Sequence, residues 1–183
     1  MPKLLVALTG MPGSGKSTIA QGLKHKGYQI INMGDAVRAE CKRRNVSPSG
    51  ENLGQIMLEL REKHGMAAIA KLIQPDIQDS TFDVIIIDGI RSNEEIQELK
   101  KTHPLRMLSV HASTDTRFTF LSKRGRSDDP DTRDNFDQRD TRELGVGISK
   151  PIALSDESIS NNNLSIEQLI TKADEIIKFW IQS

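Results

Sequence analysis

Gly10-Met11-Pro12-Gly13-Ser14-Gly15-Lys16-Ser17-Thr18 is the stretch that decides the fold of this chain of 183 residues. It matches the pattern G-x-x-x-x-G-K-[ST], which is typical of a loop that binds phosphate groups. Its glycines allow backbone conformations that point N–H groups inward at an anion. Lys16 supplies a point charge for the β- and γ-phosphates of a nucleotide, and Ser17 offers a hydroxyl oxygen to Mg²⁺. The stretch therefore predicts a nucleotide site.

The sequence on either side of this loop has the context that a phosphate loop requires. Residues 3–9 form a short apolar run typical of a buried strand, and residues 17–24 repeat apolar side chains at helical spacing. A helix that begins at Lys16 adds the positive end of its dipole to the site. A chance match in a glycine-containing turn would lack these flanks. We therefore expect residues 10–18 to bind the phosphates of a nucleoside triphosphate, with Mg²⁺ beside Ser17.

The composition describes a globular chain without a net charge. Charged residues make up 27% and hydrophobic residues 36% of the sequence, and 25 Lys and Arg balance 25 Asp and Glu. This balance argues against nucleic acid as a partner and leaves room only for a local basic patch. Cys41 is the one cysteine, so an internal disulfide is excluded. The sequence has neither a signal-peptide pattern nor a run long enough to span a membrane, so we expect a cytoplasmic protein without membrane contact.

Apolar, β-branched runs alternate with helical patterns along the whole chain. Further strands are expected at residues 28–32, 82–88, 105–111 and 157–160. Helices are expected at residues 36–44, 51–63, 66–73, 114–124, 132–144 and 165–181, with one more capped by Ser92. Asp35 is the expected N-cap of the helix at 36–44, and Pro75 is expected to stop the helix at 66–73. The alternation predicts one α/β domain over residues 1–183, with a parallel sheet between helices.

Two further segments carry side chains suited to a second anionic ligand. Asp35 and Arg38 lie one helical turn apart after the second strand, where Arg38 could hold an acceptor phosphate. An exposed Asp–Arg pair is the alternative for this segment. Asp88 ends the buried strand at 82–88, where it could hold the Mg²⁺ shell, and Arg91 could contact the acceptor phosphate. A helix cap is the alternative for Asp88, and the nearby phosphate loop disfavours it.

Arginines gather in the segment between residues 117 and 142. They are Arg117, Arg124, Arg126, Arg133, Arg139 and Arg142. Two arginine-bearing helices joined by a polar, aspartate-rich loop are typical of a lid that closes cations over a transferred phosphoryl group and excludes water. The alternative is a set of solvated helix faces on which arginines pair with neighbouring aspartates, and some of the six are expected to do only that.

These motifs together resemble those of the nucleoside monophosphate kinases. Residues 10–18, 34–38, 88–91 and 124–126 carry the likeness, and adenylate kinases have similar G-D-x-x-R and D-G-x-x-R segments, the second one residue longer than here. The whole chain more closely resembles an archaeal family of P-loop proteins related to adenylate kinases and dephospho-CoA kinases. The blocks that carry this second likeness are residues 33–35, 88–92, 124–129 and 142–145. This resemblance implies a P-loop NTPase fold with three α/β/α layers and a five-stranded parallel sheet. It further implies an acceptor-binding insert at about 33–80 and an arginine-rich lid at about 124–134.

The motifs and this resemblance together assign expected roles. Catalytic roles fall to Lys16, Asp35, Arg124, Arg126 and Arg139, and contacts with ATP fall to residues 10–18, Arg124 and Asn162. Acceptor contacts fall to Asp35, Arg38, Arg91 and Arg142, and metal contacts to Ser17 and Asp88. Two departures from dephospho-CoA kinases stand out. Asp35 is alone where those kinases have two aspartates, and residues 154–163 keep only part of their pattern before the last helix.

The expected activity is transfer of the γ-phosphoryl group of ATP to a small nucleotide-like acceptor, as in a nucleoside monophosphate kinase. Lys16, Mg²⁺ and lid arginines would neutralise charge, and a phosphate acceptor would need no general base. A hydroxyl acceptor, as in dephospho-CoA, is the first alternative, with Asp35 as the base. A regulatory ATPase that drives a macromolecular partner is the second. The sequence leaves open the acceptor, the oligomeric state and the choice between ATP and GTP.

Overall fold

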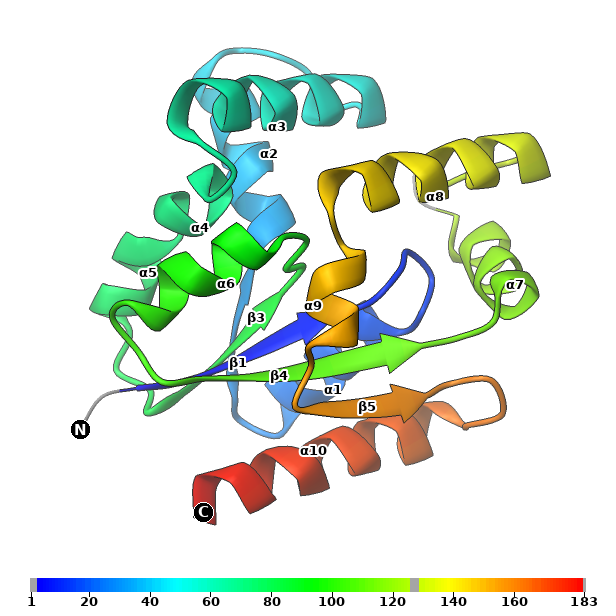
Figure 1. Ribbon diagram of the computed structural model, residues 1–183. Helices are drawn as coiled ribbons and strands as arrows, with labels where there is room; N and C mark the ends of the chain where they lie inside the picture. The colour runs from blue at the N-terminus through cyan, green and yellow to red at the C-terminus, as the bar shows by residue number, and fades with distance from the viewer. Residues whose placement is uncertain (1–2, 126–128, 183) are drawn as a thin grey trace.

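The computed structural model describes residues 3–125 and 129–182 and has a parallel sheet at its centre (Figure 1). Its strands are β1 (Leu4–Thr9), β2 (Gln29–Asn32), β3 (Val84–Asp88), β4 (Leu105–His111) and β5 (Glu157–Ser160). Within the described residues the strands pair in the order β2-β3-β1-β4-β5, and every pair is parallel. The predicted α/β fold with a five-stranded parallel sheet is confirmed.

Helices cover both faces of this sheet (Figure 1). They are α1 (Lys16–His25), α2 (Met33–Arg43), α3 (Gly50–His64), α4 (Ala68–Leu72), α5 (Gln74–Asp79), α6 (Asn93–Lys100), α7 (Thr114–Arg124), α8 (Arg133–Val146), α9 (Ser149–Ala153) and α10 (Ile166–Gln182). α1 and α10 pack on one face, whereas α4, α5 and α6 pack on the other. In the part of the chain that the structure describes, no helix is long and apolar enough to cross a membrane.

The side chains of β1 alternate between the two hydrophobic cores. Leu5 and Ala7 belong to the core beneath α4, α5 and α6, whereas Val6 and Leu8 pack in the core that contains Ile19 of α1. All five side chains are fully buried. A strand buried on both faces needs apolar residues at successive positions, which explains why the continuous run before the phosphate loop became the centre of the sheet.

Within the described residues, the structure corrects the start of one predicted helix and adds two short helices that were not predicted, α5 and α9. α2 begins at Met33, because the side chain of Asn32 accepts a hydrogen bond from the backbone N–H of Asp35 and so caps the helix. Asp35 therefore lies in the first turn and is not the cap. Pro75 lies in the first turn of α5, where its missing N–H removes no intrahelical hydrogen bond. The short helix α9 was not predicted, and its Pro151 is buried.

The carboxyl ends of the strands point toward the loop after β1 and toward α7 and α8 (Figure 1). Ligands of open parallel sheets bind at this edge, because loops and helix N-termini converge there. The fold therefore brings together the phosphate loop, the end of β3 and the arginine-bearing helices, which are far apart in the sequence.

Candidate active site

A cavity of about 590 Å³ opens at the carboxyl ends of the strands. It lies between the phosphate loop, α2, α3, the segment after β3, and the helices α7 and α8. Among the described residues that line it, seven side chains are basic and three are acidic. The basic ones are Lys16, Arg38, Arg61, Arg91, Lys123, Arg124 and Arg139, and the acidic ones are Asp88, Glu95 and Glu143. This excess of positive charge suits a polyanionic ligand.

The phosphate loop has the backbone conformation that its glycines predict. Gly13 and Gly15 have φ angles of +81° and +110°, a region that other residues rarely adopt. Lys16 begins α1, and its Nζ donates hydrogen bonds to the carbonyl oxygens of Gly10 at 2.5 Å and Met11 at 3.1 Å. The ammonium group is therefore held at the loop itself, within the cradle predicted to bind phosphates.

Asn161 holds the phosphate loop from the end of β5, a role that was not predicted from the sequence. Its buried Nδ2 donates a hydrogen bond to the carbonyl oxygen of Ser14 at 2.9 Å. Asn162, the predicted nucleotide contact, instead accepts a hydrogen bond from the backbone N–H of Ser113 at 2.7 Å and is not among the residues that line the cavity. The segment at 164–166 does line it, so the wall still includes the loop after β5.

Ser17 and Asp88 offer the oxygen atoms that a Mg²⁺ ion would need beside a bound nucleotide. Both residues line the cavity, and Asp88 is the last residue of β3, paired in register with Leu8 of β1. Asn32 Nδ2 donates a hydrogen bond to Asp88 Oδ2 at 2.9 Å and so orients this carboxylate. A hydroxyl and one carboxylate are sufficient protein ligands, because nucleotide phosphates and water supply the remaining ones. The residues present therefore fit the ion.

The pKa of Lys16 is shifted by burial and by four charged side chains. Burial lowers the pKa of Lys16 to about 8, the carboxylates of Asp88 and Glu143 oppose this shift, and the guanidinium groups of Arg91 and Arg139 add to it. All four of these side chains line the same cavity as Lys16. This cavity is where the terminal phosphate of a nucleotide would lie.

Binding of ADP without metal is expected to take up protons at and above pH 8. Since the pKa of Lys16 is about 8 in the free protein, part of the protein lacks this charge there. Phosphate groups favour the ammonium form, so binding raises this pKa, and affinity should fall with rising pH by at most about tenfold per pH unit. Calorimetry in buffers of different ionisation enthalpy measures the uptake. Equal uptake by a Lys16→Met variant would contradict this assignment.

Arg38, Arg61 and Arg91 line the part of the cavity wall, here called the acceptor end, that is formed by α2, α3 and the segment after β3. Arg61 is buried, and its Nη2 donates a hydrogen bond to Glu95 Oε1 at 3.1 Å. The other oxygen of Glu95 accepts a hydrogen bond from the backbone N–H of Arg91 at 2.8 Å, beside the capping box that begins α6. Arg61 was not predicted as a site residue. The available signal was its charge at a buried position of the helix predicted at 51–63.

Arg91 connects this part of the cavity wall with α8. Its Nη1 donates a hydrogen bond to Met57 Sδ at 3.2 Å, and its Nε lies 3.4 Å from Glu143 Oε2. Glu143 is buried on α8 and lines the cavity. It lies within the run from Arg142 to Gly145 that contributed to the family resemblance, but it was not predicted as a functional residue.

Arg124 and Arg139 bring positive charge to the cavity from α7 and α8. Both line it. Arg124 forms a two-point ion pair with Asp129, and Oδ1 of the same carboxylate lies 3.7 Å from Nη1 of Arg139. One buried aspartate therefore holds two arginines from different helices near each other. Arg126, the other predicted catalytic arginine, lies outside the described residues.

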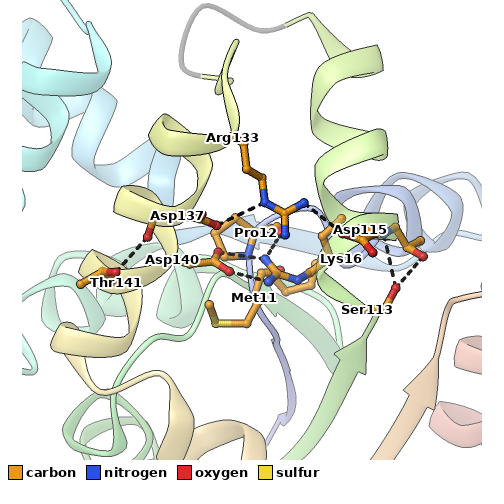
Figure 2. A network of polar contacts seen from close by, with 11 residues as sticks. Met11, Pro12, Lys16, Ser113, Asp115, Arg133, Asp137, Asp140 and Thr141 are labelled. Carbon is orange, nitrogen blue, oxygen red and sulfur yellow. Dashed lines mark hydrogen bonds and ion pairs between the residues drawn. The ribbon is translucent and has the colours of Figure 1, made fainter.

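Arg117 connects α7 with both the phosphate loop and α8. Its Nη1 donates hydrogen bonds to the carbonyl oxygen of Pro12 at 3.0 Å and to Asp140 Oδ1 at 2.9 Å, and its Nη2 donates to Asp140 Oδ2. The guanidinium lies 4.9 Å from the ring centre of Phe136. Figure 2 shows Pro12, Asp140 and Arg133 in this network, and Arg133 pairs with two exposed aspartates. Arg117 and Arg133 thus pair with aspartates, as the alternative for the arginine cluster predicted.

Some predicted site residues lie away from the cavity wall. The Asp35 side chain is 72% exposed and pairs with Arg38 at 2.5 Å, and Arg142 is exposed on α8. Neither of them is among the residues that line the cavity, and the same is true of Met11 and Ser14 in the loop. Asp35 therefore forms the exposed Asp–Arg pair that was the alternative interpretation, although its partner Arg38 does line the cavity.

The sequence matches a known family model and several relatives. A family model described as an AAA domain matches residues 9–137. A UPF0200 protein from Hyperthermus butylicus is 37% identical over 175 residues, which cover 96% of this chain and 94% of the relative. A UPF0200 protein from Methanocaldococcus jannaschii is 40% identical over 179 residues, which cover 96% and 89% of the two chains.

Solved structures with a similar fold include kinases. TT1252 from Thermus thermophilus has a TM-score of 0.67 at 15% identity, and shikimate kinase from Bacteroides thetaiotaomicron has 0.66 at 14%, each covering 96% of this chain and 98% of the other. At these identities the likeness shows the fold alone, so the relation to adenylate kinases and dephospho-CoA kinases stays a prediction. The match to relatives over nearly its whole length shows that the chain belongs to the UPF0200 family.

Proposed function

We propose that this protein is an ATP- and Mg²⁺-dependent phosphotransferase that acts on a small, anionic, nucleotide-like acceptor. The observation that carries the proposal is a single cavity lined both by the phosphate loop and by Arg38, Arg61 and Arg91. ATP bound at the loop would direct its γ-phosphoryl group into this space, toward an acceptor held by the arginines. The fold that the chain shares with kinases supports the same class of reaction.

The side chains of the cavity would divide the work of phosphoryl transfer. Lys16 would hold the β- and γ-phosphates, and Arg124 and Arg139 would neutralise charge on the oxygens of the transferred group. Mg²⁺ held by Ser17 and Asp88 would supply further charge neutralisation. The lid helices would exclude water, so that the acceptor receives the phosphoryl group. Catalysis of this kind depends on positioning and electrostatics, and these are what the cavity offers.

Two classes of acceptor were predicted from the sequence. A nucleoside monophosphate, as in an adenylate-kinase-like enzyme, is supported by Arg38 and Arg91 in the cavity wall. A hydroxyl acceptor, as in dephospho-CoA, was predicted with Asp35 as its base. That role for Asp35 has no support, because its carboxylate is exposed and pairs with Arg38. A hydroxyl acceptor would therefore need another carboxylate.

A regulatory ATPase is the alternative from another class. Such a protein would need no second group of arginines beside its nucleotide site, because a macromolecular partner would bind at the protein surface and not inside the cavity. The buried Arg61, held by Glu95 in the cavity wall, favours a small molecule instead. A small-molecule kinase is therefore the better-supported proposal.

ATP consumption with Mg²⁺ tests the proposal, with AMP, CMP, UMP, GMP, dephospho-CoA and nucleosides as candidate acceptors. Saturable stimulation by one of them, with a phosphorylated product, would support a small-molecule kinase. Stimulation by a macromolecule but by none of these compounds would contradict the proposal and favour the regulatory ATPase.

Replacing Arg38 by Ala is expected to weaken acceptor binding and to leave ATP binding unchanged. A hydrogen bond between charged groups contributes roughly 1.5–3 kcal/mol, so KM for the acceptor should rise about 10- to 100-fold. Lys42→Ala is the matched control, because Lys42 lies one turn further along α2 and is exposed. Steady-state kinetics with each substrate varied in turn makes the measurement. A rise in KM for ATP instead would contradict the acceptor role.

A further inference from the structure

Glu143 is a buried carboxylate on α8 that lines the cavity. Its side chain is 9% exposed. Among the described residues, Oε2 has no hydrogen-bond partner. It lies 3.4 Å from Arg91 Nε, an ion pair that lacks hydrogen-bond geometry. A buried oxygen with an open acceptor position is unusual in a folded protein and points to a ligand that donates a hydrogen bond there.

The surroundings of Glu143 are those of a reacting group. It lines the same cavity as Lys16, and its charge raises the pKa of that ammonium group, as the charge of Asp88 does. Its ion-pair partner Arg91 belongs to the acceptor end of the cavity. An acceptor bound between Arg91 and the γ-phosphoryl group of ATP would therefore have the Glu143 carboxylate beside its reacting atom.

The charge of this carboxylate discriminates between the two classes of acceptor. A phosphate that attacks ATP is already anionic, needs no base, and would be repelled by a buried carboxylate beside it. A hydroxyl group is neutral, and its proton must leave as the new bond forms. A carboxylate within hydrogen-bond reach of the hydroxyl is the group that can receive this proton. Asp35 is outside the cavity wall, whereas Glu143 is part of it.

We propose that the acceptor reacts through a hydroxyl group and that Glu143 receives the hydroxyl proton. This inference rests on the proposed phosphotransferase function. The acceptor oxygen forms a bond to the γ-phosphorus, the bond from that phosphorus to the β,γ-bridging oxygen breaks, and ADP leaves with its electron pair. The proton passes to Oε2 of Glu143 and then to water. Arg38 and Arg61 would bind an anionic group elsewhere on the acceptor. The expected acceptor is therefore a small compound that carries both a hydroxyl group and a phosphate or carboxylate.

Acceptor-free hydrolysis of ATP tests Glu143 before any acceptor is known, because water then takes the place of the hydroxyl. Glu143→Gln keeps the size of the side chain and is expected to lower the rate about 100-fold or more. Affinity for the non-hydrolysable analogue AMP-PNP with Mg²⁺, measured by calorimetry, should stay unchanged. Glu143→Asp should recover part of the rate, and Asp134→Asn on the exposed side of α8 should keep all of it. Full activity of Glu143→Gln would overturn the proposal.

A double variant separates a chemical role from the mere positioning of Arg91. If the only role of Glu143 were to position Arg91, then Glu143→Gln would not lower the rate of ATP hydrolysis further in an Arg91→Met protein. We expect the fold-losses in rate of the two single variants to multiply in the double variant, because the two side chains have different roles. An Arg91→Met/Glu143→Gln protein as active as Arg91→Met alone would overturn the proposal. So would a higher Mg²⁺ requirement in Glu143→Gln, since this would make Glu143 a contributor to the metal site.

Anion binding gives a test that is independent of turnover. With the phosphate loop saturated by ADP and Mg²⁺, inorganic phosphate serves as the probe of the acceptor end. Glu143→Gln removes a repelling charge beside Arg91 and should bind phosphate at least about tenfold more tightly than the unmodified protein. Glu143→Asp should not. Equal phosphate affinity in Glu143→Gln and the unmodified protein would show that the carboxylate does not face the acceptor, and would overturn the proposal.

The product identifies which inference fails, if one does. Phosphorus NMR distinguishes a phosphomonoester, formed at a hydroxyl, from a phosphoanhydride, formed at a phosphate. With whichever compound stimulates ATP consumption, we expect a phosphomonoester. A phosphoanhydride would overturn the hydroxyl acceptor and leave the phosphotransferase standing. A protein that consumes no ATP with or without the candidate acceptors would overturn the proposed function itself.

Discussion

Lys16→Ala protein is expected to lose phosphoryl transfer while keeping its fold. The ammonium of Lys16 is the charge that the loop itself carries, held at the carbonyl oxygens of Gly10 and Met11. Removing a preorganised charge that faces the transferred group should lower kcat by about 1,000-fold or more. Measurement of ATP consumption with the acceptor present decides this, and Lys24→Ala, exposed on the same helix, is the matched control.

The stability of the same variant separates loss of chemistry from loss of structure. Burial lowers the pKa of Lys16 from 10.5 to about 8, so the folded protein holds this charge at a cost whenever the pH is below about 8. Between these two pKa values the unfolded state binds more protons, so stability rises with pH in that window. Lys16→Ala removes this dependence. It should be no less stable than the unmodified protein at pH 7, and any advantage should shrink as the pH approaches 10.5.

Chemical denaturation at pH 7 and at pH 9.5, with circular dichroism as the signal, measures both points. Loss of activity together with a fall in the free energy of unfolding would mean that Lys16 is structural. Activity that persisted in rigorously purified Lys16→Ala protein would contradict the assignment of the phosphate loop.

The phosphate loop and the strands could be predicted from the sequence because their signals are local. The loop needs particular residues at fixed spacing, and β1 and β3 are continuous apolar runs. Asp88 could also be predicted, since a polar residue that ends a buried strand must lie at the carboxyl edge of the sheet. Ser92 begins α6 with a capping box, as a serine three residues before a glutamate indicates.

The buried polar residues of the site could not be predicted in the same way. Arg61, Asn161 and Glu143 acquire their roles from partners far away in the sequence, such as the Ser14 carbonyl oxygen that Asn161 holds. Asp35 illustrates the opposite error. Its spacing to Arg38 suggested a site pair, but Asn32 takes the cap position, so α2 starts earlier and Asp35 faces solvent.

The arginines between residues 117 and 142 show that a charge pattern in the sequence does not indicate which ion pairs are buried. Arg117 and Arg133 are both on helices of the predicted lid, and both pair with aspartates. The side chain of Arg117 is 6% exposed, whereas that of Arg133 is 45% exposed. An ion pair at the surface contributes little, but breaking a buried pair leaves an uncompensated charge. The two arginines should therefore differ greatly in their effect on stability.

Arg117→Met is expected to lower the free energy of unfolding by about 3–5 kcal/mol, because Asp140 would lose its buried partner. Arg133→Met is the matched control, with a change of about 1 kcal/mol or less. Both guanidinium groups lie over the Phe136 ring, at 4.9 Å and 5.3 Å, and Arg133 also lies 5.5 Å from the centre of the Phe118 ring. Loss of cation–π contacts therefore does not explain a larger effect of Arg117→Met. Urea denaturation of both proteins, with equal slopes, makes the comparison.

The double variant Arg117→Met/Asp140→Asn shows whether the cause is the unpaired carboxylate. It should recover part of the stability lost in Arg117→Met, because no charge is then left buried. It should not recover ATP affinity, since the hydrogen bond from Arg117 Nη1 to the Pro12 carbonyl oxygen, 3.0 Å long, holds the phosphate loop and stays lost. Equal stability of Arg117→Met and Arg133→Met would contradict this prediction. It would mean that the contacts of Arg117 with Asp140 and with the Pro12 carbonyl oxygen contribute no more to the free energy of unfolding than the exposed pairs of Arg133 do. The positions of Arg139 and Glu143 on α8 would then need another explanation.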